Sequence, residues 1–356
     1  MAILDRVRTA RARALAQPGP EPGVAVVVTT IASPTPALRR TASLAAAAGW
    51  RLVVVGDRKT PADFRLSGAR YLDIGAQAGA GWRLAVALPL DHYSRKNIGY
   101  LEAIAGGAPV VAETDDDNAP YDTFFAPARE VAAARVVRER GWVNVYRLFT
   151  DRPVWPRGFP LDRVREAPPA PGDALERVRC PIQQGLADGD PDVDAVYRLV
   201  VGEPVTFERR PPVALAPGAL CPTNSQNTLW WPDAFPLLYL PSHCSFRMTD
   251  IWRGLVAARI AAEQGWHVLF RTSTVHQDRN EHDFVRDFAQ EVDGYLRNAG
   301  IVEVLEATPL PATVPDALAA CYGALVEAGV LPAAELGLVE RWLADLADAE
   351  RRAAHG

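Results

Sequence analysis

Val24-Ala25-Val26-Val27-Val28 and Leu52-Val53-Val54-Val55 are two short, continuous apolar runs near the start of the chain. Runs of this length without alternation are typical of strands that are buried on both faces. Between them, Thr35-Pro36 predicts a helix with Thr35 as its N-cap and Pro36 in its first turn, ending near Gly49. This strand–helix–strand unit predicts an α/β fold in which helices flank a mixed, mostly parallel central sheet.

Polar residues follow the predicted strands at the points where the strands end. Thr29 and Thr30 end the first strand, Asp57 and Lys59 follow the second, and Asp115 follows a third apolar run. Ligands of such sheets bind at the carboxyl ends of the strands. We therefore predict that these residues lie at one ligand site.

The third run, Val110-Val111-Ala112, leads into three consecutive aspartates, Asp115, Asp116 and Asp117. Carboxylates crowded at a strand end need a cation or water, because an unpaired buried charge is costly. In an extended segment Asp115 and Asp117 share a face, which predicts a site for Mn²⁺ or Mg²⁺. An ion held by few carboxylates completes its shell with water and substrate phosphates, which favours a nucleotide diphosphate. The alternative is a solvated acidic loop.

A helix is predicted from Ser94 to Ala105, directly before this third run. It opens with Arg95, Lys96 and Asn97, and helix N-termini supply donors for phosphate. We expect Arg95 and Asn97 to contact the nucleotide; a solvated first turn is the alternative.

The composition narrows the class of protein. The chain has a net charge of −5 and its basic residues are scattered, so nucleic acid is not an expected partner. The four cysteines form no Cys-x-x-Cys pair, which favours buried free thiols. No apolar run reaches the roughly 18–20 residues of a transmembrane helix, and the N-terminus lacks the apolar core of a signal peptide. We therefore predict a cytoplasmic protein without a transmembrane segment.

Glycine-rich phosphate loops are absent from the sequence. It contains no Gly-x-x-x-x-Gly-Lys-Ser/Thr, and the first strand–helix turn lacks Gly-x-Gly-x-x-Gly. An α/β nucleotide site with a carboxylate cluster in place of these loops indicates a nucleotide sugar, whose diphosphate leaves with the help of a metal.

Ordered motifs extend over most of the chain, among them Tyr93-Ser94-Arg95-Lys96-Asn97 and Thr114-Asp115-Asp116-Asp117-Asn118, with others at 50–61, 155–160, 189–195, 224–228, 249–254 and 279–283. Together they resemble the STELLO-like glycosyltransferases, a family named from plant Golgi proteins. That family is distantly similar to the reversibly glycosylated polypeptides, which include UDP-arabinopyranose mutases.

The resemblance implies a GT-A-like, Rossmann-type nucleotide-sugar-binding fold. It implies an Asp-x-Asp metal motif at Asp115, Asp116 and Asp117. It also implies that Asp57 contacts the base or ribose and that Arg95 faces the diphosphate.

We predict a metal-dependent glycosyltransferase that uses a nucleotide-diphosphate sugar, with UDP-sugar as the expected donor and an unknown glycan or small-molecule acceptor. The expected catalytic residues are Asp117, Arg95 and Asp250. Asp250 is a candidate general base for the acceptor hydroxyl, and a helix N-cap is its alternative role. His282 is a candidate late metal ligand.

Two other functions stay open: a nucleotide-sugar mutase and a non-catalytic protein that binds nucleotide sugars. In the mutases an arginine accepts the sugar, and Arg157 and Arg163 lie near the corresponding place. Trp230, Trp231 and Trp252 could stack on a sugar or pack in the core. Assembly as a homo-oligomer is also open.

The chain is expected to divide into four segments. These are an N-terminal helical tail at 1–20, a nucleotide-sugar-binding half at 21–165, an acceptor-side half of the same GT-A domain at 166–290, and a C-terminal helical segment at 291–356. The proline-rich stretch at 167–172 marks the boundary between the halves.

Overall fold

The computed structural model describes residues 23–278 and 283–355, so the predicted tail at 1–20 lies outside the described residues. Within these ranges, eleven strands form one sheet. Its order is β3 (Ala69–Leu72), β2 (Arg51–Gly56), β1 (Ala25–Thr30), β4 (Val111–Thr114), β12 (Asn227–Trp230), β9 (Ile182–Gly189), β13 (Val268–Gln277), β10 (Val213–Leu215), β6 (Val131–Val137) and β8 (Glu176–Arg179), and β5 (Asn118–Pro120) pairs with β13. A separate ribbon joins β7 (Gly141–Trp142) to β11 (Ala219–Leu220).

The predicted strand–helix–strand unit is confirmed. β1 and β2 pair in parallel and are joined by α2 (Pro36–Ala48). The Thr35 side chain caps α2 by accepting from the Leu38 N–H at 3.0 Å, and Pro36 is its first residue. Gly49 ends it at φ 71°, in the left-handed region that glycine adopts without strain.

The sheet is parallel on one side and mixed on the other. β3, β2, β1 and β4 are all parallel. β12 runs antiparallel between β4 and β9, whereas β9 and β13 are parallel to each other. The predicted fold, a mixed α/β sheet flanked by helices, is confirmed.

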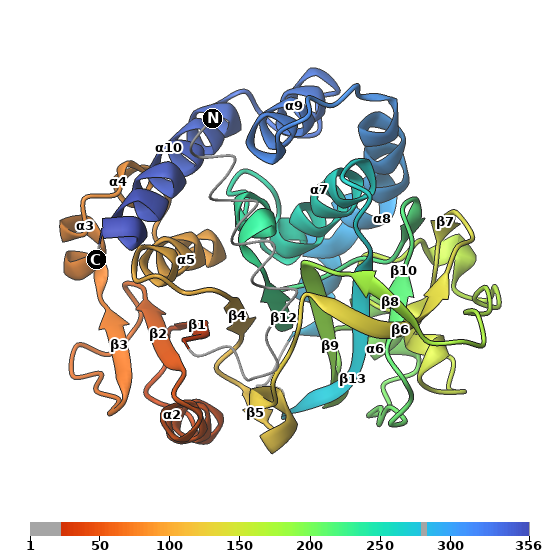
Figure 1. Ribbon diagram of the computed structural model, residues 1–356, viewed down its shortest axis with the longest axis horizontal. Helices are drawn as coiled ribbons and strands as arrows, with labels where there is room; N and C mark the ends of the chain where they lie inside the picture. Colours follow the sequence, from red (N-terminus) through yellow and green to blue (C-terminus); the bar gives the residue numbers. More distant parts are fainter. Residues whose placement is uncertain (1–22, 279–282, 356) are drawn as a thin grey trace.

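The valine runs are buried on both faces because helices cover both faces. Val27 and Val55 pack in one core with α5 (Lys96–Ala105), and Val26 and Val28 pack with α2 on the opposite face. Gly99 of α5 lies so close to the sheet that a Cβ there would come within 2.5 Å of Val27. Figure 1 shows α5 and α2 on opposite sides of these strands.

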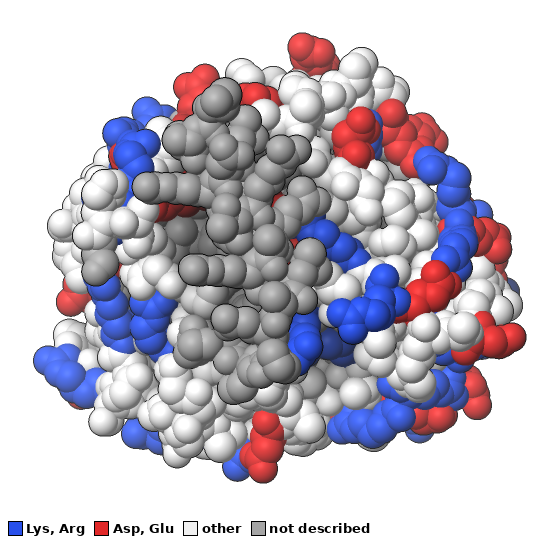
Figure 2. All heavy atoms as spheres, viewed as in Figure 1, with Lys and Arg blue, Asp and Glu red and all other residues white. Residues whose placement is uncertain are grey.

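The remaining helices are α3 (Ile74–Gly79), α4 (Arg83–Ala87), α6 (Ala195–Val200), α7 (Thr249–Glu263), α8 (Phe284–Ala307), α9 (Val314–Glu327) and α10 (Ala334–His355). α7 shares the core of α5, and α10 lies along α4 and α5 (Figure 1). In the described part of the chain, no helix combines the length and apolar character needed to cross a membrane. Figure 2 shows acidic and basic side chains interspersed on the face that it presents.

Candidate functional site at the carboxyl ends of β1, β2 and β4

The three aspartates lie in a turn between β4 and β5. The Asn118 N–H donates to the Asp115 carbonyl at 3.3 Å, and residues 116 and 117 are turn residues. The extended geometry that we predicted for this segment is therefore wrong. Because the chain bends here, the three carboxylates meet three different sets of neighbours instead of alternating across a strand.

Asp115 is held from the side of α5. Its Oδ1 accepts hydrogen bonds from the Tyr93 hydroxyl at 2.7 Å and from the Lys96 ammonium at 3.1 Å. Lys96 is fully buried and also donates to the Thr114 carbonyl at 2.8 Å. Burial, helped by the charge of Asp115, raises the pKa of Tyr93 well above its usual value, so the phenol remains a donor. Sequence reasoning assigned the phosphate contact to this helix start but did not foresee Tyr93.

Asp116 is held from the side of β1. The Thr30 hydroxyl donates to its Oδ2 at 2.5 Å, and the Thr35 hydroxyl donates to its carbonyl. The pKa of Asp116 is raised, chiefly because burial penalises the carboxylate, while the bond from Thr30 lowers it. The structure thus brings Thr30 against the aspartate turn, and its neighbour Thr29 is partly buried.

Asp117 is held from the side of β13. The Gln277 side-chain amide donates to its Oδ2 at 2.9 Å, and Gln226 donates to the Gln277 amide oxygen at 2.6 Å. Sequence reasoning missed both glutamines as site residues. The only signal was the polar motif at 224–228, which does not reveal that β13 ends beside the turn.

Asp57 lies where the loop after β2 meets the segment before α5. Its Oδ2 accepts from the His92 N–H at 3.1 Å, and its Oδ1 accepts from the Arg58 N–H at 2.8 Å. Lys59 is exposed beside it. Two loops from different parts of the sequence are thereby joined at the carboxyl end of β2.

Arg95 and Asn97, which we expected at the nucleotide, are both bonded to other parts of the protein. The buried Arg95 guanidinium donates to Gln77 Oε1 at 2.8 and 2.5 Å and to the Ala85 carbonyl at 3.0 Å. Asn97 is fully buried and bonds both backbone groups of Leu240, each at 2.9 Å. Both side chains therefore fix the protein's own loops.

Asp250 is buried in an ion pair, which speaks against the predicted general base. Its two oxygens accept from Arg157 at 3.0 and 2.9 Å, and Ser225 donates to Oδ2 from both its backbone N–H and its hydroxyl at 3.2 Å. Burial opposes ionisation, but the charge and hydrogen bonds of Arg157 outweigh it and lower the pKa of Asp250 to about 2. A carboxylate held this way is a weak proton acceptor at neutral pH. Its alternative role as helix N-cap is also wrong, because Met248 occupies that position.

The turn offers oxygen ligands to a hard cation. Both polar atoms of the buried Asn118 side chain lack a hydrogen-bond partner within the described residues. Carboxylate and amide oxygens suit a divalent ion that completes its shell with water and phosphate. Across residues 23–278 and 283–355, however, no three His, Cys, Asp or Glu side chains are grouped as metal ligands. His282 lies outside the described residues.

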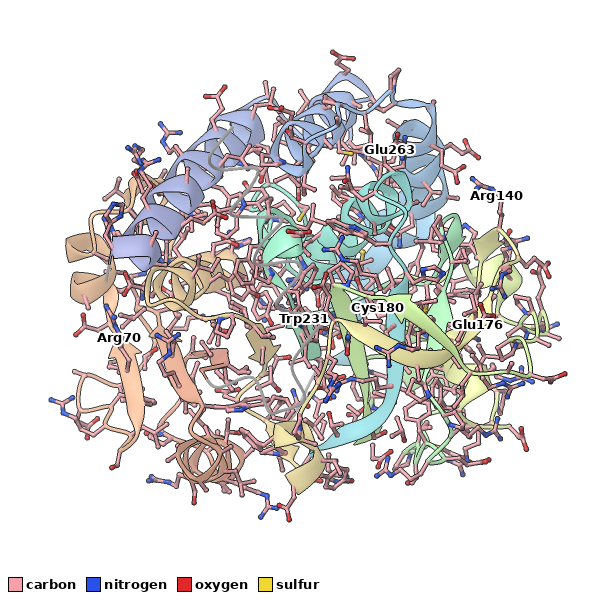
Figure 3. The ribbon with its side chains drawn as sticks, viewed as in Figure 1. Arg70, Arg140, Glu176, Cys180, Trp231 and Glu263 are labelled. Carbon is pink, nitrogen blue, oxygen red and sulfur yellow. The ribbon has the colours of Figure 1, made fainter. Side chains whose placement is uncertain are left out.

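The tryptophans proposed for sugar stacking are core residues. Trp230, Trp231 and Trp252 are all buried, and Figure 3 labels Trp231 within the structure. A hollow of about 270 Å³ lies elsewhere, among α7, α8 and the ribbon of β7 and β11, and Arg140 and Glu263 line it (Figure 3). None of the predicted site residues lines this hollow.

The fold and the candidate site define an α/β protein with a cluster of polar side chains at the carboxyl ends of parallel strands, around a turn of three aspartates.

Sequence comparison then identifies similar proteins. The chain is 34% identical over 305 residues to the probable glycosyltransferase STELLO2 of Arabidopsis thaliana, covering 79% of this chain and 39% of the relative. It is 32% identical over 349 residues to STELLO1 of the same plant, covering 90% and 44%. This similarity over most of the chain confirms the resemblance to the STELLO-like glycosyltransferases that the motifs predicted.

The chain spans less than half the length of these relatives, 39% and 44%. No protein-family model matches it. Among solved structures it is similar to a mycobacterial protein and to glucosyl-3-phosphoglycerate synthase of M. tuberculosis, each with a TM-score of 0.41 and 12% identity. The alignments cover 79% and 78% of this chain and 76% and 81% of those structures.

Proposed function

We propose that this chain is a glycosyltransferase of the GT-A type that uses a nucleotide-diphosphate sugar and a divalent cation, with a UDP-sugar as donor. The observation that carries the proposal is the aspartate turn at the carboxyl end of β4, supported on three sides by fixed polar side chains. The names of the two relatives support the activity. The carboxylates and the unpartnered Asn118 amide support the cation.

The chain's own residues would preorganise the site. Lys96 and Tyr93 fix Asp115, and Gln277 fixes Asp117, so little rearrangement is needed when a ligand binds. Asp115 and Asp117 would hold a divalent ion, which would supply positive charge for the departing diphosphate. The nucleoside would extend toward Asp57, at the end of the strand beyond β1.

Arg157, one of the two arginines named for the mutase alternative, is poorly placed to accept a sugar. Its guanidinium is buried and donates to Asp192 at 2.7 and 2.9 Å as well as to Asp250 at 3.0 and 2.9 Å. An arginine that accepts a sugar needs a free nitrogen, and this one is committed to two carboxylates.

The test is thermal unfolding with nucleoside diphosphates and nucleotide sugars, each with and without Mn²⁺. A ligand at 100 times its dissociation constant adds about 2.7 kcal/mol of stability, which is visible as a shift in Tm. We expect a shift for a UDP-sugar only when Mn²⁺ is present. In the double variant Asp115→Asn with Asp117→Asn, this shift should disappear while the unliganded protein still unfolds in one cooperative transition.

Asp122→Asn is the matched control, because Asp122 is an exposed aspartate that pairs with Arg40 at the surface. It should keep the full metal-dependent shift. An unchanged shift in the double variant would overturn the metal assignment, and no shift with any nucleotide in the wild type would overturn the transferase proposal.

A further inference from the structure

One exposed aromatic ring lies at the site, where sequence reasoning had selected buried tryptophans. Phe246 keeps 49% of its surface exposed, whereas the next two residues, Arg247 and Met248, are buried. Its ring lies 5.9 Å from the ring of Tyr93 and 6.2 Å from that of His92, centroid to centroid. Exposed apolar side chains beside a few fixed polar groups are typical of ligand-binding sites.

The two neighbours of Phe246 place it between the two ends of the proposed nucleotide site. The His92 N–H donates to Asp57 at the end of β2, and the Tyr93 hydroxyl donates to Asp115 at the end of β4. Since β1 separates these strands, their ends lie roughly 10 Å apart. A nucleoside that reaches from a diphosphate at Asp115 toward Asp57 would pass along the His92–Tyr93 segment, beside Phe246.

The backbone that carries Phe246 is held firmly. The Ser245 hydroxyl donates to the Gln290 carbonyl at 2.5 Å, and the Met248 N–H donates to the Ser245 carbonyl at 2.9 Å. The Arg247 guanidinium donates to Glu291 at 2.9 and 2.8 Å. A ring on such a support loses little freedom when it stacks on a ligand, which favours affinity.

We propose that Phe246 is the stacking platform for the base of the nucleotide. This inference rests on the proposed function, because it takes the diphosphate to lie at the aspartate turn. Stacking on a ring is tolerant of base identity, since every base has a π-face. Phe246 therefore contributes affinity for the nucleoside part and none for the diphosphate.

The experiment is calorimetric titration of the full chain with two probes in the presence of Mn²⁺: UDP and inorganic pyrophosphate. We expect Phe246→Ala to weaken UDP binding about five- to hundred-fold and to leave pyrophosphate binding unchanged. Phe246→Trp should restore UDP binding, because it replaces one flat ring by a larger one. Phe288→Ala is the matched control, a partly exposed phenylalanine on α8 at 39% whose ring contacts Tyr295.

Three results would overturn the inference. Unchanged UDP affinity in Phe246→Ala would show that the ring does not contact the base. An equal loss for UDP and pyrophosphate would show that the ring only supports the site. A wild-type protein that binds UDP no better than pyrophosphate would show that the base has no subsite here. Failure of the wild type to bind either probe is a different result, because it refutes the proposed function itself.

Discussion

Arg157 neutralises two buried carboxylates at once, those of Asp192 and Asp250. Burial disfavours the charged guanidinium, but the two carboxylates outweigh it and raise the pKa of Arg157 well above its usual value. Replacement by methionine removes the positive charge that neutralises these two buried carboxylates. We expect Arg157→Met to lower the free energy of unfolding by about 3–5 kcal/mol, measured by urea denaturation.

Arg163→Met provides the comparison for this prediction. Arg163 pairs with Glu166 at 3.3 Å, and both side chains are substantially exposed. Surface pairs of this kind contribute at most about 1 kcal/mol. Similar losses in the two variants would contradict the role assigned to Arg157.

Asp194 makes stability depend on pH. Burial, with help from Glu291, raises its pKa to about 6 despite hydrogen bonds from the Tyr197 N–H and the Trp155 indole. The unfolded chain releases this proton near pH 4, so the folded state holds it more tightly between about pH 4 and 6. This contribution to stability is therefore full below pH 4 and is lost as the pH rises through 6, by about 3 kcal/mol.

The variant Asp194→Asn tests this prediction because an amide cannot ionise there. The free energy of unfolding of the wild type, minus that of the variant, should fall between pH 4 and pH 7 in urea titrations. A constant difference would contradict the prediction. Asp73→Asn is the control, at an exposed N-cap with a similar bond to the Ala76 N–H at 2.7 Å.

The start of α5 shows why the sequence predicted the place of the site but not its side chains. Arg95 and Lys96 stand next to each other in the same motif, yet Arg95 bonds Gln77 and Lys96 bonds Asp115. Successive residues on a helix turn by about 100°, so the direction of each side chain depends on how the helix docks. That docking is decided by long-range contacts such as Gly99 against Val27, which no local pattern contains.

α10 stabilises a loop beside the site through one buried carboxylate. Glu335 accepts from the backbone N–H groups of Ser242 and His243 at 3.2 and 3.0 Å, and from the Tyr239 hydroxyl. The Ser242 hydroxyl in turn bonds that of Ser94 at 2.9 Å, at the start of the segment that carries Tyr93. The predicted C-terminal helical segment at 291–356 includes this helix, but the loop that it holds was not predicted.

We expect Glu335→Ala to lower the free energy of unfolding by roughly 3 kcal/mol, since it leaves buried N–H donors without an acceptor. Urea denaturation measures the loss. Glu340→Ala on the exposed side of the same helix should change stability by less than about 0.5 kcal/mol. Equal effects would mean that Glu335 acts only through helix propensity.

At the scale of the whole molecule, the order of the strands differs from their order in the sequence. β6 belongs to the predicted half at 21–165, yet it lies near the far edge of the sheet beside β10. The open edge of β4 is covered by β12, whose polar residues Asn227 and Thr228 do not resemble a buried strand. Apolar runs therefore predicted the parallel strands β1, β2 and β4. The antiparallel strand β12 was not predicted, because its polar side chains find hydrogen-bond partners only in the folded protein.

It follows that a fragment of residues 23–165 should not fold by itself. It would lack β12 beside β4 and β10 beside β6, and it would expose the core that α7 covers. We expect such a fragment to show no cooperative urea transition and rapid proteolysis, in contrast to the full chain. A sharp unfolding transition for the fragment would instead establish the half at 21–165 as an autonomous unit.

The aspartate turn also has a mechanical consequence. It carries the chain directly from β4 to β5, although β5 pairs with β13, and β12 and β9 lie between β4 and β13 in the sheet. Three residues, 115–117, thus link β4 to a strand that pairs beyond the two intervening strands of the sheet (Figure 1). A ligand that stiffened this short link would restrict sliding of one side of the sheet against the other, and its binding would then be felt at β13.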